Sequence, residues 1–265
     1  MIVSLLQPIV SDSKQKNLEQ VLALIELAAT RDHANLVLLP ELWNTPFINE
    51  EILKHQDEWD DYIQPLQQTA KSLSIWIIAG TLPRKENDLL YNSCAVINTN
   101  GEIVEIADKT HLLEVHTPNH TYDEKDVFTD GNQFKSFITP WGKIGILICM
   151  DNRFPEAART IAQDCFMIAA PCGFNDKVGP IHWNALFKTR AMENQIFYLA
   201  ANPAKQTYAT YTSYGHSLVV GPDGKIIDQL DENPGVLSVE IDPKQVDQIR
   251  NRTPYWNLRR KELYS

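Results

Sequence analysis

The stretch Gly142–Glu156 reads GKIGILICMDNRFPE and changes from apolar to polar at Cys149. Its apolar part has the length and composition of a buried β-strand. The polar part contains Pro155, which suits the first turn of a helix. A tight turn between a strand and a helix can expose a side chain and direct the next backbone N–H groups at the same point. Cys149 is therefore either a small core residue or a nucleophile that the turn presents.

Segments with strand and helix patterns alternate along the chain. Residues 2–10 and 35–41 are apolar runs of strand length, and apolar residues recur at helical spacing across residues 17–30. Two more strands meet at Asn100-Gly101, a dipeptide typical of hairpin turns. Further helices are expected over residues 60–73, 155–164 and 181–194 and at the C-terminal end. The pattern predicts one α/β domain with mixed strand pairing and strands covered on both faces.

The composition excludes several classes of partner. The 265 residues carry a net charge of -10, which offers no overall attraction to nucleic acid or to an anionic membrane. The locally basic stretch 250–262 is interrupted by aromatic residues and a proline, and we interpret it as a docked terminal segment. No apolar run is long enough for a signal peptide or a membrane span. The four cysteines lack C-x-x-C spacing, which favours free thiols and a cytoplasmic location.

Three apolar strands end at residues that can carry chemistry: Glu41, Cys149 and Asn202. Ligand sites of open α/β sheets lie beyond the carboxyl ends of strands, so Glu41 and Cys149 are expected to be neighbours. A semi-buried glutamate can act as a general base, although Glu41 could also cap a loop. Lys109 ends a hairpin strand and is either solvated or a fixed cation beside a developing oxyanion.

Three separated motifs agree in order with a known family: residues 40–41 (PE), 108–112 (DKTHL) and 149–156 (CMDNRFPE). Together they resemble the carbon-nitrogen hydrolase (nitrilase) superfamily, and the resemblance continues to residues 259–264. Residues 173–195, which contain GFN, GPIHW and RAMENQ, look most like its omega-amidase branch. The resemblance implies a four-layer α-β-β-α sandwich formed as a single carbon-nitrogen hydrolase domain over residues 1–265. It also implies a homodimer or larger oligomer, with residues 243–265 docked at the interface.

The resemblance further implies a catalytic set of Glu41, Lys109 and Cys149. Glu41 would take the thiol proton, and the Cys149 thiolate would attack an amide or nitrile carbon. The Lys109 ammonium and the backbone N–H of Met150 would stabilise the oxyanion. Members of the family carry a second glutamate before the cysteine; Glu124 matches it by spacing, with Asp123 as the alternative in the same stretch.

Substrate contacts are expected from residues close to these motifs. Met150 stands where many relatives have tyrosine, and Phe47 stands where close amidase relatives often have one, so both are expected at the pocket border. Phe174 and Asn175 are further candidates. Arg153 could bind a substrate carboxylate, although it could also belong to buried charge pairs with Arg190 and Glu193 that hold the turn.

The sequence gives little support for a metal site or a phosphate-binding site. His116 and His120 have H-x-x-x-H spacing, but Pro118 between them argues against a helix, and no H-E-x-x-H is present. The sequence contains no glycine-rich phosphate loop, so we expect neither metal nor cofactor. Cys94, Cys165 and Cys172 are interpreted as packing thiols, with Cys172 a candidate for the pocket border.

The leading hypothesis is an amidase that hydrolyses a small carboxylate-bearing amide, the omega-amide of a 2-oxo dicarboxylic acid. It would release ammonia through a cysteine thioester. Alternatives on the same machinery are an N-carbamoyl amidohydrolase, a deaminated-glutathione-type amidase and a nitrilase. A non-catalytic binding protein with a dead site is a different class, and the presence of Glu41, Lys109 and Cys149 together disfavours it.

Overall fold

Two large β-sheets form the centre of the molecule in a computed structural model that describes residues 1–118 and 120–264. The first sheet has seven strands in the order β17-β1-β2-β3-β5-β4, with β6 paired to β5. Its strands are β1 (Ile2–Gln7), β2 (Leu36–Leu38), β3 (Trp76–Ile78), β4 (Leu82–Glu86), β5 (Leu89–Ile97), β6 (Ile103–Asp108) and β17 (Gly235–Glu240). Parallel pairs β1-β2 and β2-β3 lie beside antiparallel ones, so the predicted mixed pairing is confirmed.

The second sheet has six strands in the order β16-β15-β12-β11-β10-β9. Its strands are β9 (Lys135–Thr139), β10 (Gly142–Ile146), β11 (Met167–Pro171), β12 (Phe197–Ala201), β15 (Leu218–Val220) and β16 (Ile226–Gln229). Two small hairpins lie outside the sheets: β7 (Glu114–Thr117) with β8 (His120–Asp123), and β13 (Thr207–Tyr208) with β14 (Tyr211–Thr212).

The helices follow the predicted pattern closely. They are α1 (Lys14–Thr30), α2 (Asn49–Lys54), α3 (Trp59–Leu73), α4 (Pro155–Ile161), α5 (Gly179–Asn194) and α6 (Lys244–Arg252), and the 3₁₀ helices are η1 (Glu124–Asp126), η2 (Cys149–Arg153) and η3 (Lys261–Leu263). Only α2 was not anticipated, because six residues are too few for a clear periodicity. None of the helices within the described residues is long and apolar enough to cross a membrane.

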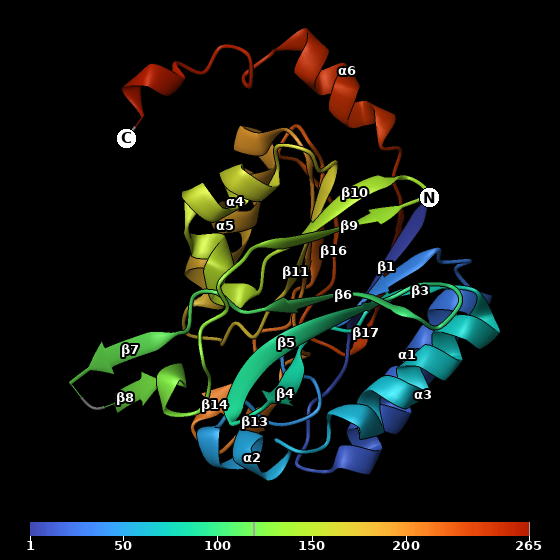
Figure 1. Ribbon diagram of the computed structural model, residues 1–265, viewed down its shortest axis with the longest axis vertical. Coiled ribbons are helices and arrows are strands. Elements are labelled where there is room, and N and C mark those ends of the chain that lie inside the picture. Colours follow the sequence, from blue (N-terminus) through green and yellow to red (C-terminus); the bar gives the residue numbers. More distant parts are fainter. Residues whose placement is uncertain (119, 265) are drawn as a thin grey trace.

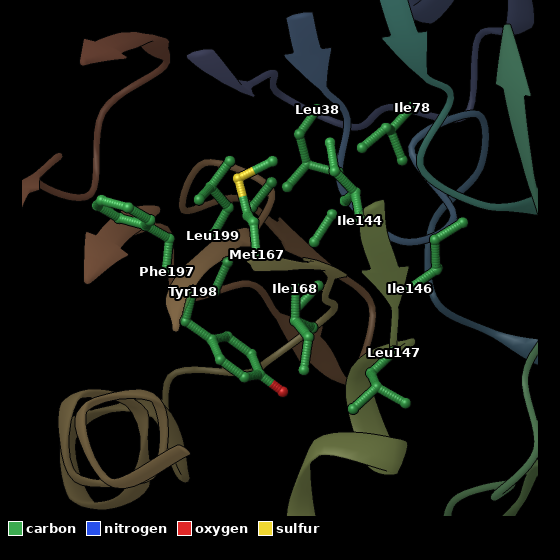
Figure 2. Packing of buried hydrophobic residues seen from close by; sticks show 14 of the residues in the cluster. Leu38, Ile78, Ile144, Ile146, Leu147, Met167, Ile168, Phe197, Tyr198 and Leu199 are labelled. Atoms are coloured by element: carbon green, nitrogen blue, oxygen red, sulfur yellow. The ribbon is translucent and has the colours of Figure 1, made fainter. Parts of the chain in front are cut away.

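The layers follow from the alternation of side chains along the strands. On β2, Leu36 and Leu38 join the core between the two sheets, whereas Val37 packs toward α1 and α3. Figure 1 places α1 and α3 on one side of the sheets and α4 and α5 on the other. In Figure 2, Leu38 and Ile78 of the first sheet lie opposite Ile144 and Met167 of the second. The predicted α-β-β-α sandwich is therefore confirmed.

The strand ends of the two sheets meet at one end of the sandwich. Glu41 lies just beyond β2, and Cys149 lies just beyond β10 in the neighbouring sheet. The backbone N–H of Glu41 donates to the carbonyl of Cys172, which follows β11, at 3.1 Å. Because β10 and β11 pair in parallel, this bond brings Glu41 to the side of the sheet where Cys149 lies. The predicted proximity of the two strand ends is confirmed.

The C-terminal segment lies at the end of the molecule along which α6 runs (Figure 1). Several large apolar side chains after α6 are exposed: Tyr255, Leu258, Leu263 and Tyr264. Ser265, the last residue of the predicted docking segment, lies outside the described residues. Docking of this segment at an oligomer interface stays a prediction.

Candidate active site

Cys149 is presented by a strained turn at the end of the β10 segment. Its φ of 39° lies in the left-handed region, which non-glycine residues adopt rarely and at a cost in free energy. The buried side chain of Asn152 stabilises the turn because its Nδ2 donates to the carbonyls of Leu147, at 3.1 Å, and Cys149, at 3.0 Å. The thiol residue is 8% exposed, which leaves a narrow approach to it. The tight turn predicted after the strand is present.

A buried lysine joins two glutamates beside this turn. Lys109 Nζ donates to Glu41 Oε1 at 2.8 Å and to the two carboxylate oxygens of Glu124 at 2.8 and 2.7 Å. All three side chains are fully buried. Cys149 is also among the groups that act on the pKa of Lys109, which places its sulfur in the same cluster. The structure thus brings together Glu41, Lys109, Glu124 and Cys149.

Glu124 and Asp123, the two candidates for the second acid, differ in their contacts. Glu124 begins η1, and its Oε2 also accepts from the backbone N–H of Leu113. Asp123 instead accepts from the backbone N–H of Lys125 at 2.9 Å and caps the same short helix. Glu124, not Asp123, therefore occupies the position of the second acid.

The pKa values of Lys109 and Glu124 both differ from those of the free side chains. Burial lowers the pKa of Lys109, but the carboxylates of Glu124 and Glu41 outweigh that effect and hold the pKa well above its usual value. Burial raises the pKa of Glu124 to about 7, because Glu41 adds to the rise and Lys109 opposes it only in part. Lys109 is consequently always charged, whereas Glu124 can gain or lose a proton near neutral pH.

The two carboxylate oxygens of Glu41 differ in their hydrogen bonds. Its Oε1 accepts from Lys109 and from Asn92 Nδ2, the latter at 2.9 Å, whereas Oε2 is buried and has no hydrogen-bond partner within the described residues. A Cβ at Gly173 would lie 2.9 Å from this Oε2, so the glycine keeps the approach to it open. A cavity of 20 Å³ is lined by Glu41 and Phe47 among others and suffices for about one water.

The carboxylate of Asp151 connects the loop that follows Lys109 to the turn that contains Cys149, and we call this set of contacts the latch. Asp151 Oδ1 accepts from Thr110 Oγ1 at 2.7 Å and from the His111 backbone N–H at 2.8 Å. Its Oδ2 accepts from the backbone N–H of Ile148 at 3.1 Å. Asp151 is buried, so these bonds fix the residues next to Lys109 relative to the residue before Cys149.

Phe47 lies at the pocket border, as predicted. The Lys109 Nζ lies 5.9 Å from the centroid of its ring. Tyr211 stacks on the same ring at 5.5 Å, and Tyr122 lies against it at 6.0 Å with a tilt of 44°. Met150 is half-buried in the first turn of η2, where helical N–H groups have no intrahelical partner. Its place at the pocket border stays a prediction.

Two roles were expected for Arg153, a substrate contact and a buried charge pair, and the structure contradicts the second. Arg190, not Arg153, forms the ion pair with Glu193, at 2.9 Å, and it also donates to the carbonyls of Asn152 and Arg153. The Arg153 guanidinium is half-buried and stacks on the Phe174 ring at 4.9 Å. The charge-pair hypothesis is therefore wrong for Arg153, because its guanidinium lies against Phe174 and its Nη1 lies 3.1 Å from His182 Nδ1.

The remaining candidates have structural roles. Phe174 is buried, and its backbone N–H donates to Asn202 Oδ1 at 2.7 Å. Asn175 Oδ1 accepts from the backbone N–H groups of Lys177 and Val178, both at 3.1 Å, just before α5. This side-chain oxygen is thus engaged in the turn. Substrate contact by either residue stays a prediction.

The structure offers no evident place for a metal. Within residues 1–118 and 120–264 no group of three or more histidines, cysteines, aspartates or glutamates could hold one. His116 Nε2 lies 2.7 Å from Glu114 Oε1, and the side chain of His120 lies outside the part that is described.

Sequence reasoning missed Asn92, Asp151, Gly173, Tyr122 and Tyr211. Asn92 lies on β5 opposite the end of β6, a pairing that no local pattern reveals. Asp151 lies within the motif of residues 149–156, but its contacts with Thr110 and His111 depend on the position of the loop that follows Lys109. A signal for Gly173 was its place directly after the strand that ends near Cys172.

The fold and this buried Glu–Lys–Glu–Cys cluster define a class of hydrolase with a cysteine at a strand-to-helix turn. The sequence profile named Carbon-nitrogen hydrolase matches residues 3–251. The chain belongs to the carbon-nitrogen hydrolase family, the nitrilase superfamily, and is a hydrolase of carbon–nitrogen bonds other than peptide bonds.

Named relatives refine this assignment. Omega-amidase NIT2 of Xenopus tropicalis is 34% identical over 266 residues, which cover 99% of this chain and 96% of the relative. Omega-amidase NIT3 of Saccharomyces cerevisiae is 32% identical and covers 96% of this chain and 91% of its own. These similarities support an amidase within the superfamily.

Solved structures agree in fold. Nit3 of Saccharomyces cerevisiae, a member of branch 10 of the nitrilase superfamily, has a TM-score of 0.89 at 30% identity and covers 98% of this chain and 96% of that one. The carbon-nitrogen hydrolase of Helicobacter pylori G27 has a TM-score of 0.91 at 25% identity, with 100% and 97% coverage.

Proposed function

We propose that this amidase hydrolyses the omega-amide of a small 2-oxo dicarboxylic acid to the acid and ammonia, through a thioester on Cys149. The observation that carries the proposal is the buried ammonium of Lys109 between two glutamates, with one oxygen of Glu41 that has no hydrogen-bond partner among the described residues. The similarity to proteins named omega-amidases supports the choice of substrate.

The first half of the reaction forms the thioester. Glu41 Oε2 takes the thiol proton, and the sulfur of Cys149 attacks the amide carbon. Lys109 Nζ donates to Glu41 and to both oxygens of Glu124; in our proposal one of its two bonds to Glu124 is released, and that N–H donates to the oxyanion. The backbone N–H of Met150 is the second donor. Collapse of the tetrahedral intermediate breaks the carbon–nitrogen bond, and protonated Glu41 gives its proton to the departing ammonia.

The second half hydrolyses the thioester. Glu41 Oε2, now deprotonated, takes a proton from a water that attacks the thioester carbon, and the cavity that Glu41 lines has room for one water. The carbon–sulfur bond breaks, the thiolate of Cys149 regains the proton from Glu41, and the acid leaves. Glu124 holds Lys109 in place throughout.

The guanidinium of Arg153 supports a substrate with a carboxylate. It lies four residues after the nucleophile and 4.9 Å from the centroid of the Phe174 ring, its Nη1 lies 3.1 Å from His182 Nδ1, and it has no carboxylate partner within the described residues. A planar guanidinium matches the geometry of a carboxylate and can bind it through two parallel bonds. In our proposal it binds the end of the substrate away from the amide.

Ammonia release from 2-oxoglutaramate, compared with an N-carbamoyl amino acid and an aliphatic nitrile, tests the proposal. We expect turnover of the first, loss of turnover in Cys149→Ala, and a raised KM in Arg153→Gln. Turnover of one of the other two substrates without the first would contradict the omega-amidase assignment. Full activity of Cys149→Ala would contradict the thioester.

We also propose that the chain assembles as a homodimer or higher oligomer through the segment after α6. The exposed apolar side chains of Leu258 and Leu263 support this proposal. Light scattering of wild type and of Leu258→Asp/Leu263→Asp tests it: the double variant should be the smaller species, and equal masses would contradict the proposal.

A further inference from the structure

Tyr122 lies in the wall of the active site and has no role in the reaction described above. It belongs to β8, two residues before Glu124, in the β7/β8 hairpin that extends from one side of the molecule (Figure 1). Its ring packs against the ring of Phe47 at a centroid distance of 6.0 Å. Tyr211 stacks on the same Phe47 ring at 5.5 Å. One wall of the site is therefore aromatic and carries two phenol hydroxyls.

The two hydroxyls differ in how they are satisfied. Tyr211 Oη donates to the carbonyl of Gly173 at 3.1 Å. The hydroxyl oxygen of Tyr122 is buried but has no hydrogen-bond partner among the residues that the structure describes. A buried, unpaired hydroxyl costs about 1 to 3 kcal/mol of stability. A ligand that offered an acceptor at this position would remove that cost on binding.

The pKa of Tyr122 responds to the charged groups around it. Burial raises this pKa, the carboxylates of Glu124 and Glu41 raise it further, and Lys109 opposes them. These are the same groups that form the active site. With its pKa raised, the phenol stays neutral throughout the working pH range and remains a hydrogen-bond donor.

The net charge of this inner region selects among possible acceptors. Glu41 and Glu124 together oppose the single charge of Lys109, so the cluster carries one net negative charge when both acids are ionised. A second anion placed here would be repelled, whereas a neutral carbonyl oxygen would not. The guanidinium of Arg153 lies on the Phe174 ring and beside His182, has no carboxylate partner within the described residues, and suits the carboxylate end of a substrate.

We infer that Tyr122 is a specificity-determining residue whose hydroxyl donates to a neutral carbonyl oxygen on the acyl chain of the substrate. This inference rests on the proposed function and deepens it: the oxygen is the 2-oxo group of a dicarboxylic omega-amide. Tyr122 selects the 2-oxo amide over the amide of the same length that has a methylene in its place.

Two substrates separate this contact from all others. 2-Oxoglutaramate and glutaramate share the amide, the chain length and the terminal carboxylate, and they differ only in the 2-oxo oxygen. In Tyr122→Phe, kcat/KM for 2-oxoglutaramate should fall about 10-fold, the effect of one lost neutral hydrogen bond. The value for glutaramate should stay within about 2-fold, because the ring still packs on Phe47.

The matched control is Tyr211→Phe. Its hydroxyl is already bound to Gly173, so its removal should change kcat/KM for both substrates by the same factor. Thermal denaturation of both variants checks that they fold.

The outcomes distinguish the inference from the proposed function. If wild type hydrolyses 2-oxoglutaramate and Tyr122→Phe keeps its preference over glutaramate, the inference is wrong and the proposed function stands. An equal loss for both substrates in Tyr122→Phe also overturns the inference. If wild type hydrolyses neither amide, the proposed function fails and the inference fails with it.

Discussion

Replacing Lys109 by methionine tests the electrostatic design of the site. The change keeps an apolar stem of similar length but removes the only cation that contacts Glu41 and Glu124 within the described residues, at 2.8 and 2.7 Å. All three groups are fully buried, so the remaining charges cannot be solvated by water. Removing one partner of a buried ion pair destabilises proteins by about 3 to 5 kcal/mol. We expect a loss in this range at pH 8.

The pH dependence of this loss has a definite sign. The pKa of Glu124 is about 7 in the folded protein and 4.5 for an unperturbed glutamate, so its contribution to the free energy of unfolding is complete below pH 4.5 and is lost as pH rises to 7. Lys109 lowers that pKa, so its removal moves the folded pKa above 7. Above pH 7 the free energy of unfolding of the variant therefore continues to fall by about 1.4 kcal/mol per pH unit, whereas the contribution of Glu124 in wild type no longer changes.

Urea unfolding at pH 6 and pH 8, followed by tryptophan fluorescence, measures both effects. Lys54→Met is the control: its pair with Glu51 at 2.6 Å is exposed, and such pairs contribute about 0 to 1 kcal/mol. A second variant, Lys109→Met/Glu124→Gln, should recover part of the loss because one uncompensated acid is gone. A loss below about 1 kcal/mol for Lys109→Met at pH 8, or a loss that does not grow between pH 6 and 8, would refute the reasoning.

Three further changes probe other parts of the site. Glu41→Gln removes the base, and we expect ammonia release to fall about 1,000-fold; a fall below 10-fold would assign the base elsewhere. Gly173→Ala places a methyl 2.9 Å from Glu41 Oε2, and kcat/KM should fall about 100-fold while urea unfolding changes little; an unchanged kcat/KM would mean that this oxygen is not used. Asp151→Asn weakens the latch, so kcat should fall about 10-fold at constant KM, and a rise in KM alone would argue for substrate contact instead.

The sequence was informative where a local pattern carries the information. The run from Gly142 to Cys149 has the period and length of a strand, and the polar residues after it predict a turn, so the presentation of the thiol could be foreseen. The proximity of Glu41 followed from the rule that strand ends share an edge. Lys109 became a candidate only through its place among the motifs of a known family.

The rest depends on pairings that are distant in sequence. Asn92 reaches Glu41 because β5 pairs with β3, which in turn pairs with β2, the strand before Glu41; these registers are set by packing across the sheet, not by the residues beside Asn92. The role of Arg153 stayed open between two alternatives because the sequence does not reveal which of two arginines pairs with Glu193. The unpaired hydroxyl of Tyr122 appears only when Phe47 and the hairpin are placed together.

The central claim is that Cys149 carries the acyl group during hydrolysis. Rapid acid quench of wild type during turnover of 2-oxoglutaramate, followed by intact-protein and peptide mass spectrometry, measures this directly. We predict a mass increase equal to the substrate minus ammonia, located on the peptide that contains Cys149 and absent in Cys149→Ala. Steady ammonia release with no adduct on Cys149 at any quench time, or with the adduct on another residue, would contradict the account.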